Sequence, residues 1–180
     1  MRAPLLSTPR RPGSAEFFRT RRGVVASAAT LLAVSLTGCG QNPVYLDTPT
    51  MSQEDAAACQ HLKDALPDDL ADQHRRLTQP ASALGAAWGD DPPVTLLCGV
   101  GVPDSFDKFA TCEEADGVGW FVPEAQIDDQ SKDVTMTTVG YRPRIAVTVP
   151  SRLRPDGVAA VMSTLAGPVK QQLRLVQACQ

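Results

Sequence analysis

The sequence predicts an α+β fold: a two-layer sandwich in which a mainly antiparallel sheet of four to five strands carries an N-terminal and a C-terminal helix on one face. Two observations predict it. Apolar residues recur at helical spacing over 52–66 and again from about 158 to 176. Between them, over 83–149, lie short apolar or alternating runs separated by turn residues, which is the pattern of strands joined by short connections.

The first 38 residues have the pattern of an export signal. Six arginines and a single acid precede an uncharged run over 23–36. Only sixteen residues separate Arg22 from Cys39, whereas a membrane-spanning helix needs about 20 predominantly apolar residues. We therefore interpret residues 1–38 as a cleaved signal peptide and not as a permanent membrane span.

Leu36-Thr37-Gly38-Cys39 resembles the lipobox of bacterial lipoproteins. The resemblance implies that a diacylglyceryl group is transferred to the thiol of Cys39 and that the chain is cut before this residue. Two acyl chains on Cys39 suffice for stable attachment to a membrane. The alternative is a lone cysteine beside an ordinary cleavage site. Thr20-Arg21-Arg22 also resembles a twin-arginine export signal, but no cofactor motif follows it.

The rest of the chain is predicted to be one acidic domain. Removal of residues 1–38 leaves 142 residues, which we divide into a tether over 39–50 and a single domain over 51–180. The signal holds six of the 17 basic residues and one of the 20 acidic residues, so the mature chain carries 11 and 19 and a net charge of −8. Such a domain is a poor partner for nucleic acid or for an anionic membrane surface.

Cys59, Cys98, Cys112 and Cys179 remain in the mature chain. An even number of cysteines in an exported domain suggests two disulfides, for which three pairings exist. We predict Cys59 with Cys179, because the first and last helices would cover the same sheet face, and Cys98 with Cys112, because a strand and the following loop need only a short link. The alternative is that some of them are small buried thiols.

Two helices are predicted before the strands begin. Ser52 caps the first helix, its apolar stripe runs from Cys59 to Leu66, and Pro67 ends it. Residues 68–77 are predicted to form a second, short polar helix.

The strands follow in order. Apolar runs over 83–88 and 94–100 flank a turn and predict a hairpin. A third strand is predicted over 117–122. The alternating runs over 134–139 and 145–149 are rich in β-branched residues and predict the clearest hairpin. The connecting segments are expected to be loops and exposed turns.

The last helix is predicted from about Val158, with apolar residues near one face as far as Val176. Gly167-Pro168 is expected to kink or split it, because proline lacks the backbone donor that the helix needs.

Several short motifs together resemble a known family. They are Leu66-Pro67 after Cys59, Trp88-Gly89-Asp90, Leu97-Cys98-Gly99-Val100, Gly117-Val118-Gly119-Trp120-Phe121, Tyr141-Arg142-Pro143 and Val147-Thr148-Val149-Pro150. Their combination, over about Met51 to Cys179, resembles the actinobacterial lipoproteins of domain-of-unknown-function family 3515. The resemblance implies an envelope location. It carries over no catalytic residue, since the family has no assigned activity.

Trp88, Asp90, Asp116, Trp120 and Arg142 are the candidate binding residues. Both tryptophans lie at predicted strand ends beside glycines, which allow a ligand to approach the backbone closely. Together with the two acids and the arginine they could line a small cleft with a polar rim. The alternative is that both tryptophans fill the core and that Arg142 pairs with a local acid.

The sequence favours a binding protein over an enzyme. It contains no GxSxG, no HExxH and no glycine-rich phosphate loop. His61 and His74 lie among polar residues, and no Cys/His spacing fits a zinc site, so we expect neither a metal nor a cofactor. We expect a lipid-anchored protein on the outer face of the cytoplasmic membrane that binds an envelope protein or a cell-wall component. The alternative is a cell-wall hydrolase or transferase that uses carboxylates.

Overall fold

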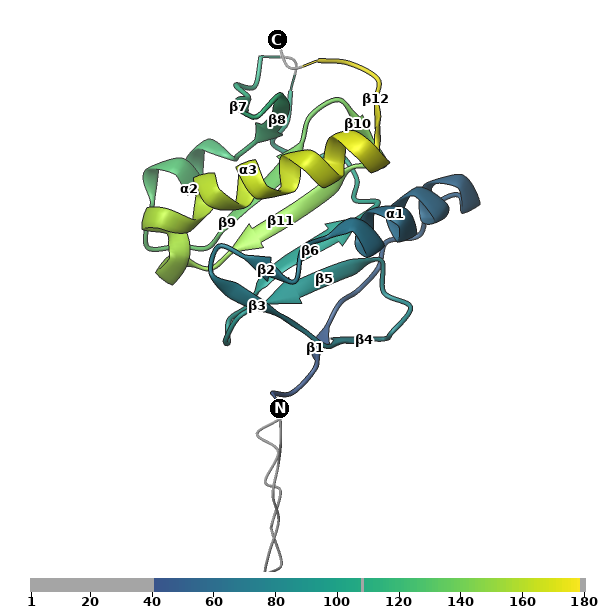
Figure 1. Cartoon of the computed structure of the whole chain (residues 1–180). Coiled ribbons are helices and arrows are strands. Elements are labelled where there is room, and N and C mark those ends of the chain that lie inside the picture. The colour runs from purple at the N-terminus through teal and green to yellow at the C-terminus, as the bar shows by residue number, and fades with distance from the viewer. Residues whose placement is uncertain (1–40, 108, 179–180) are drawn as a thin grey trace, which may run out of the picture. The chain divides into compact units, whose positions relative to one another are not determined.

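The computed structural model describes residues 41–107 and 109–178, which form a large sheet with helices packed over it (Figure 1). The predicted signal peptide, the predicted lipid-bearing Cys39, and Cys179 lie outside the described residues. In chain order the elements are β1 (Val44–Tyr45), α1 (Gln53–Ala65), β2 (Asp69–Leu70), β3 (Gln73–Arg76), β4 (Thr78–Gln79), β5 (Gly85–Trp88), β6 (Val94–Cys98), β7 (Glu113–Ala115), β8 (Val118–Phe121), α2 (Glu124–Asp128), β9 (Val134–Thr138), β10 (Tyr141–Arg142), β11 (Ile145–Val149), the 3-10 turn η1 (Ser151–Leu153), α3 (Arg154–Gln172) and β12 (Arg174–Leu175).

An eight-stranded sheet forms the centre of the fold, in the order β2-β3-β5-β6-β11-β9-β8-β7 with antiparallel neighbours. The predicted α+β fold with an antiparallel sheet is confirmed, but the sheet has eight strands where four to five were expected. β11 lies in the middle, where Val147 pairs with Leu96 of β6 and with Met136 of β9. Alternate residues of β6 and β11 are buried, so one face of the sheet builds the core.

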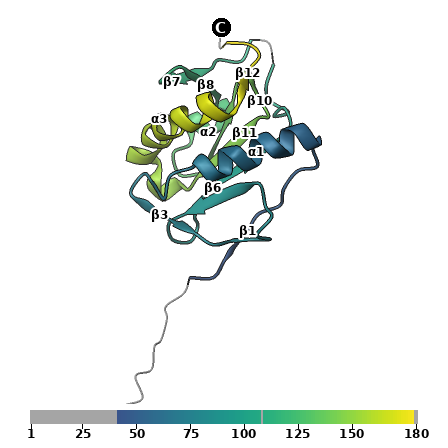
Figure 2. The same ribbon diagram turned by 45° about the vertical axis from the view of Figure 1, so that its right-hand side comes forward.

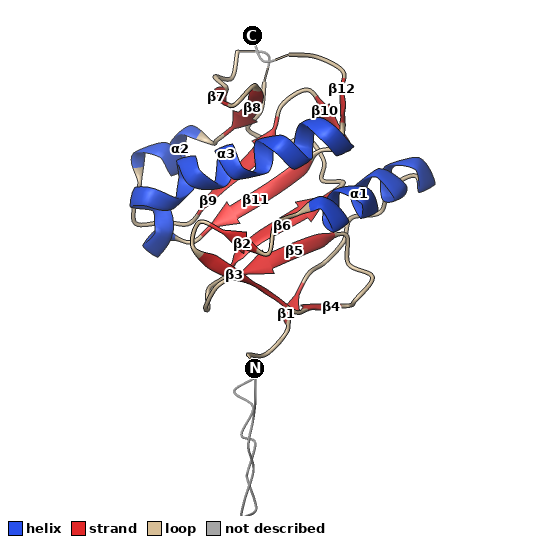
Figure 3. Cartoon of the chain, viewed as in Figure 1, coloured by secondary structure: helices blue, strands red, loops and turns tan. Residues whose placement is uncertain are grey.

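α1 and α3 pack side by side on that face of the sheet (Figure 2). Figure 3, coloured by secondary structure, shows both helices lying over the strands. α1 begins as predicted, because the Ser52 hydroxyl accepts a hydrogen bond from the Asp55 N–H at 3.1 Å. α3 begins at Arg154, earlier than predicted. It runs through Pro168 to Gln172 as one helix, so the proline does not split it.

The segment 68–77 forms the hairpin β2–β3, and the polar helix predicted there is wrong. Ala71 and Asp72 adopt φ angles of 50° and 59° and make the two-residue turn. Leu70 is fully buried, and Arg75 pairs with Trp88 of β5, so the hairpin extends the sheet. Pairing with a distant strand therefore outweighs the local preference of a polar segment.

The start of the described chain is fixed to the domain, although residues 39–50 were predicted to be a tether. β1 pairs in parallel with β4, and Leu46 is buried against Gly85 of β5. The buried guanidinium of Arg76 donates to the Asn42 carbonyl at 2.5 Å. The chain is thus held from residue 42 onward.

A disulfide joins Cys59 of α1 to Cys98 of β6, with their Cα atoms 5.6 Å apart. The predicted pairs Cys59 with Cys179 and Cys98 with Cys112 are therefore wrong. The two helices are neighbours as expected, but Cys59 faces the sheet beneath α1, which helix adjacency alone does not reveal. Cys112 is also disulfide-bonded.

The remaining strand predictions match β5, β6, β8, β9 and β11. The segment 123–133, expected to be an exposed turn, carries the short helix α2. Among the described residues, no helix combines the length and the apolar character needed to cross a membrane.

Candidate functional site

The five candidate residues predicted from the sequence do not form one site. Trp88 and Trp120 are fully buried in the core, on β5 and β8, which are separated by three strands of the sheet. Asp90 follows β5, and Asp116 occupies the turn between β7 and β8 with a φ of 49°. Arg142, in contrast, lines a large cavity.

Trp88 has a structural role. Its Nε1–H donates to the Pro67 carbonyl at 3.0 Å, just beyond the end of α1. The guanidinium of Arg75 lies 5.8 Å from the centre of the Trp88 ring and donates to the carbonyls of Lys63 and Leu66 at 3.1 and 3.0 Å. These bonds satisfy carbonyls that the last turn of a helix leaves without a partner.

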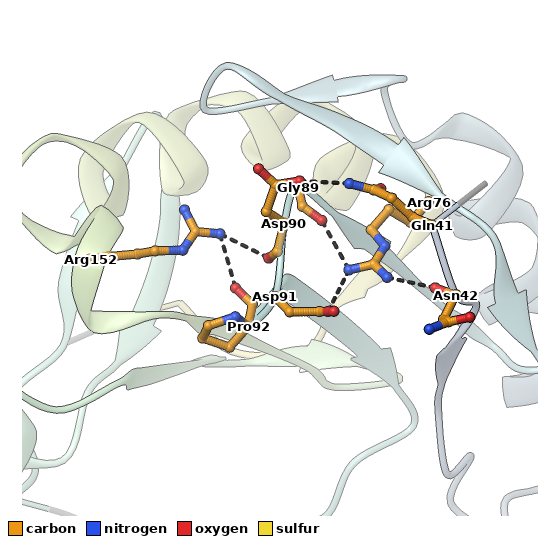
Figure 4. Close-up of polar contacts among 8 residues, drawn as sticks. All are labelled: Gln41, Asn42, Arg76, Gly89, Asp90, Asp91, Pro92 and Arg152. Atoms are coloured by element: carbon orange, nitrogen blue, oxygen red, sulfur yellow. Dashed lines mark hydrogen bonds and ion pairs between the residues drawn. The ribbon is translucent and has the colours of Figure 1, made fainter. Parts of the chain in front are cut away.

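Asp90 belongs to a polar cluster around the β5–β6 turn (Figure 4). The Arg76 side chain, 5% exposed, donates to the Gly89 carbonyl at 3.1 Å and to Asp91 Oδ1 at 2.6 Å. Gln41 Nε2 donates to Asp90 Oδ1 at 2.6 Å, and Arg152 donates to the Asp90 carbonyl at 2.9 Å. The cluster joins the first described residues, the turn and η1, so it holds the fold together at this end.

Further cationic side chains also bind backbone carbonyls. The buried Arg154 donates to three carbonyls at and after α2, and Lys63 donates to two in the connection between β4 and β5. Lys170 donates to the Asp116 carbonyl at 2.7 Å. These cationic groups hold loops in place, so we assign them a structural role and not a role in ligand binding.

Residues of β8, β9 and β10 line a cavity of about 530 Å³. β10 pairs with β12 in a separate two-stranded sheet near β8 (Figure 1). The lining of the cavity also includes the loop before β7 and the last described residues, 176–178. Arg142 and Arg144 both line it, on either side of Pro143. We call it the arginine pocket. Its volume falls within the range of small-molecule sites.

The two arginines make the pocket basic. Arg142 Nη1 donates to the neighbouring Tyr141 carbonyl at 2.8 Å, whereas the Arg144 side chain makes no hydrogen bond or ion pair within the described ranges. Partial burial, and then the positive charge of Arg142, lower the pKa of Arg144 below its usual value. An anion bound beside the two guanidinium groups would offset this lowering, because an opposite charge favours the protonated form of Arg144.

Two threonines of β9 also contribute to the lining. Thr138 is buried there, and its Oγ1 accepts a hydrogen bond from the Ile145 N–H at 3.1 Å. Thr137, buried on the same strand, lies beside it in the lining.

Two other features complete the walls. Phe106 and Phe121 meet edge to face with their ring centres 5.1 Å apart, which gives the pocket an apolar side. The C-terminal segment crosses Gly140, whose carbonyl accepts from the Val176 N–H at 2.8 Å. Gly140 has a φ of 74°, and a Cβ there would collide with the Gln177 carbonyl.

The arrangement suits binding of an anion that also has an apolar part. Asp107 contributes a carboxylate to the lining, but it accepts a hydrogen bond from the Phe109 N–H at 2.7 Å.

His74 is paired with Asp69 at the surface on the β2–β3 hairpin. Within 41–107 and 109–178, no three His, Cys, Asp or Glu side chains converge on a point that could hold a metal ion.

Arg144 is the residue that the sequence prediction missed. It follows Arg142 and Pro143 in the connection between β10 and β11, and such a short basic turn resembles an ordinary solvated loop. The sequence signal that could have identified Arg144 was its spacing from Arg142, two residues away in the segment between two strands.

A family model described as "Protein of unknown function (DUF3515)" matches residues 22–177. No curated protein and no solved structure matches the chain. The match spans the sheet, both long helices and the residues of the arginine pocket up to Gln177. The chain therefore belongs to the DUF3515 family.

Proposed function

We propose that the protein is a lipoprotein of an actinobacterial cell envelope, attached through Cys39 to the outer face of the cytoplasmic membrane, and that its domain binds a small anionic component of the cell wall in the arginine pocket. One observation carries the binding part. Arg144 lies beside Arg142 in a cavity of about 530 Å³ and has no acidic partner among the residues that the structure describes, although the mature chain has a net charge of −8.

The anchoring part rests on the sequence. The lipobox-like residues 36–39 end two residues before the described chain begins. In the described domain, β1 and β4 lie at the end where the chain enters, and β7, β8 and β12 lie at the other end (Figure 1 and Figure 2). The arginine pocket therefore lies toward the end of the domain opposite to the first described residues.

The expected ligand carries a carboxylate or phosphate next to an apolar group. A guanidinium group binds such an anion through two parallel N–H donors, and hydrogen bonds to charged groups are each worth about 1.5–3 kcal/mol. The Phe106–Phe121 pair would contact the apolar part. The peptide portion of the cell wall supplies free carboxylates in that setting.

A carboxylate-dependent wall hydrolase fits the pocket less well. Most glycoside hydrolases use two carboxyl groups about 5 to 9.5 Å apart. Among the described lining residues, Asp107 supplies a single carboxylate where such an enzyme needs two, and its Oδ1 accepts a hydrogen bond from the Phe109 N–H.

Calorimetric titration tests the binding function. The lipidated protein in detergent would be titrated with soluble wall peptides and with the same peptides after amidation of their carboxylates. We expect binding of the free acids and a loss of affinity of about tenfold or more for Arg144→Gln, since one charge-assisted hydrogen bond is worth at least about 1.4 kcal/mol. Arg174→Gln serves as the control, because Arg174 is exposed and does not line the pocket, although it pairs with Arg142 across β10 and β12.

Equal heats for the free and amidated peptides would contradict the proposal. So would equal losses of affinity in the Arg144→Gln and Arg174→Gln variants. Intact mass of the wild-type protein tests the anchor separately, because a chain that begins at Cys39 must carry the added diacylglyceryl group.

A further inference from the structure

An exposed apolar surface lies at the end of the domain where the described chain begins. Tyr45 and Leu77 are 78% and 79% exposed. They are held together by the pairing of β1 with β4, in which the Val44 N–H donates to the Leu77 carbonyl at 2.9 Å. With Pro43 and Pro80 they line one shallow hollow, here called the Tyr45–Leu77 surface, and the rest of its lining is uncharged as well.

We infer that the Tyr45–Leu77 surface rests on the lipid bilayer, in the headgroup region of the outer face of the membrane. The inference rests on the proposed lipidation of Cys39, and it adds a second, direct contact between the domain and the membrane.

The short segment between Cys39 and β1 indicates that the bilayer covers the Tyr45–Leu77 surface. Pro43 is the fourth residue after Cys39 and Tyr45 is the sixth, so an extended chain spans at most about 14 and 22 Å. Tyr45 is fixed to β4, and residue 42 is fixed to Arg76, so this distance cannot grow by release of a long linker. If the thiol of Cys39 carries acyl chains in the bilayer, the Tyr45–Leu77 surface is the nearest exposed apolar part of the domain.

The chemistry of the surface matches this position. Tyrosine is favoured at membrane interfaces, because its ring is apolar while its hydroxyl reaches water and headgroups. The mature chain has a net charge of −8, so anionic lipids would repel most of its surface. The uncharged Tyr45–Leu77 surface avoids this repulsion, and its two large side chains gain from leaving water.

This contact would orient the domain. β1 and β4 lie at one end in both views, and the strands that build the arginine pocket lie toward the other (Figure 1 and Figure 2). A domain that rests on β1 and β4 holds the arginine pocket away from the bilayer, whereas a freely rotating domain would not.

Fluorescence quenching tests the inference in the lipidated, full-length mature protein. The variants are Tyr45→Trp, Leu77→Trp and, as a matched control at the other end, Leu175→Trp, whose native side chain is 51% exposed. Trp88 and Trp120 are fully buried and supply a constant background. The protein is reconstituted in vesicles of phosphatidylcholine and phosphatidylglycerol, with or without brominated acyl chains.

We expect brominated lipid to remove most of the added emission of Tyr45→Trp and Leu77→Trp, with a blue shift on reconstitution. Leu175→Trp should show neither change. If intact mass shows lipid on Cys39, equal quenching in all three variants, or quenching in none of them, would overturn the inference. A blue shift that depends on protein density and not on bromine would mean that a second copy covers the surface, which also overturns it. Mass without lipid would instead reject the anchoring on which the inference rests.

Discussion

Arg144 lies beside Arg142 in the arginine pocket, and neither side chain has an acidic partner in the described part of the chain. Burial and the charge of Arg142 lower the pKa of Arg144, which means that the folded domain carries an unfavourable electrostatic interaction there. Elsewhere the cationic groups Arg75, Arg76 and Arg154 donate hydrogen bonds to backbone carbonyls. A bound anion would offset the unfavourable interaction at this one place.

Arg144→Gln should stabilise the ligand-free protein. The substitution removes one of two like charges while keeping a polar side chain, and changes of this kind at functional sites commonly raise the free energy of unfolding by about 0.5–2 kcal/mol. Urea unfolding, followed by the emission of the buried Trp88 and Trp120, would measure it. The exposed Arg174→Gln should leave the midpoint unchanged. A lower midpoint for Arg144→Gln than for Arg174→Gln would show that the Arg144 side chain stabilises the free domain.

Gly140→Ala should displace the C-terminal segment from the pocket. The φ of 74° disfavours any side chain, and the new Cβ would collide with the Gln177 carbonyl. We expect a loss of about 1–3 kcal/mol in unfolding free energy, together with faster proteolysis of the C-terminal segment. Gly101→Ala is the control, since a Cβ there meets nothing within 4 Å. Equal stability of the two variants would argue against the close crossing.

Non-reducing peptide mapping should recover Cys59 linked to Cys98. We expect Cys112 to be linked to Cys179, because Cys112 and Ala178 line the same cavity. In the chain-entropy model, a sequence separation of 39 corresponds to about 4 kcal/mol, so the double substitution of Cys59 and Cys98 by Ala should lower the stability by about 2–4 kcal/mol. Recovery of Cys59 linked to Cys112 would contradict both the fold and the expected second pair.

Asp129 should contribute to the acid sensitivity of the fold. Hydrogen bonds from Ser131 and from Lys132 lower its pKa from 3.8 to about 2. Because the pKa is lowered in the folded state, the stabilisation is complete above pH 3.8 and is lost as the pH falls toward 2. An NMR titration of the carboxyl group should show the low midpoint in wild type and a higher one in Ser131→Ala. A wild-type midpoint near 4 would exclude these hydrogen bonds.

Strong local patterns made much of the fold predictable. β9 and β11 alternate, β5 and β6 flank a turn rich in Gly and Pro, and Ser52 caps α1, so their types follow from neighbouring residues. β2 and β3 are different, because Leu70 is their one fully buried apolar anchor and their turn is formed by Ala71 and Asp72 in unusual conformations. Such strands form because β5 is available, which a local pattern does not reveal.

The candidate site was predictable only through Arg142. The glycines beside Trp88 and Trp120 suggested ligand approach, but both rings fill the core on distant strands. Arg144 could be recognised as a site residue only in the folded structure, where it lines the same cavity as Arg142 and the C-terminal segment. In the same way, the pairing of Cys59 depended on which face of α1 meets β6, and chain spacing does not determine that face.

NMR observation of arginine side chains would examine ligand binding at the pocket itself. The lipidated protein, labelled at its arginine Nε–H groups and held in nanodiscs, would be titrated with soluble wall peptides that carry free carboxylates. We predict saturable shifts of the Arg142 and Arg144 signals, no shift of Arg152 at the β5–β6 turn, and no response to the amidated peptides. Unchanged Arg142 and Arg144 signals at saturating peptide, or shifts of Arg152 alone, would contradict anion binding in the arginine pocket.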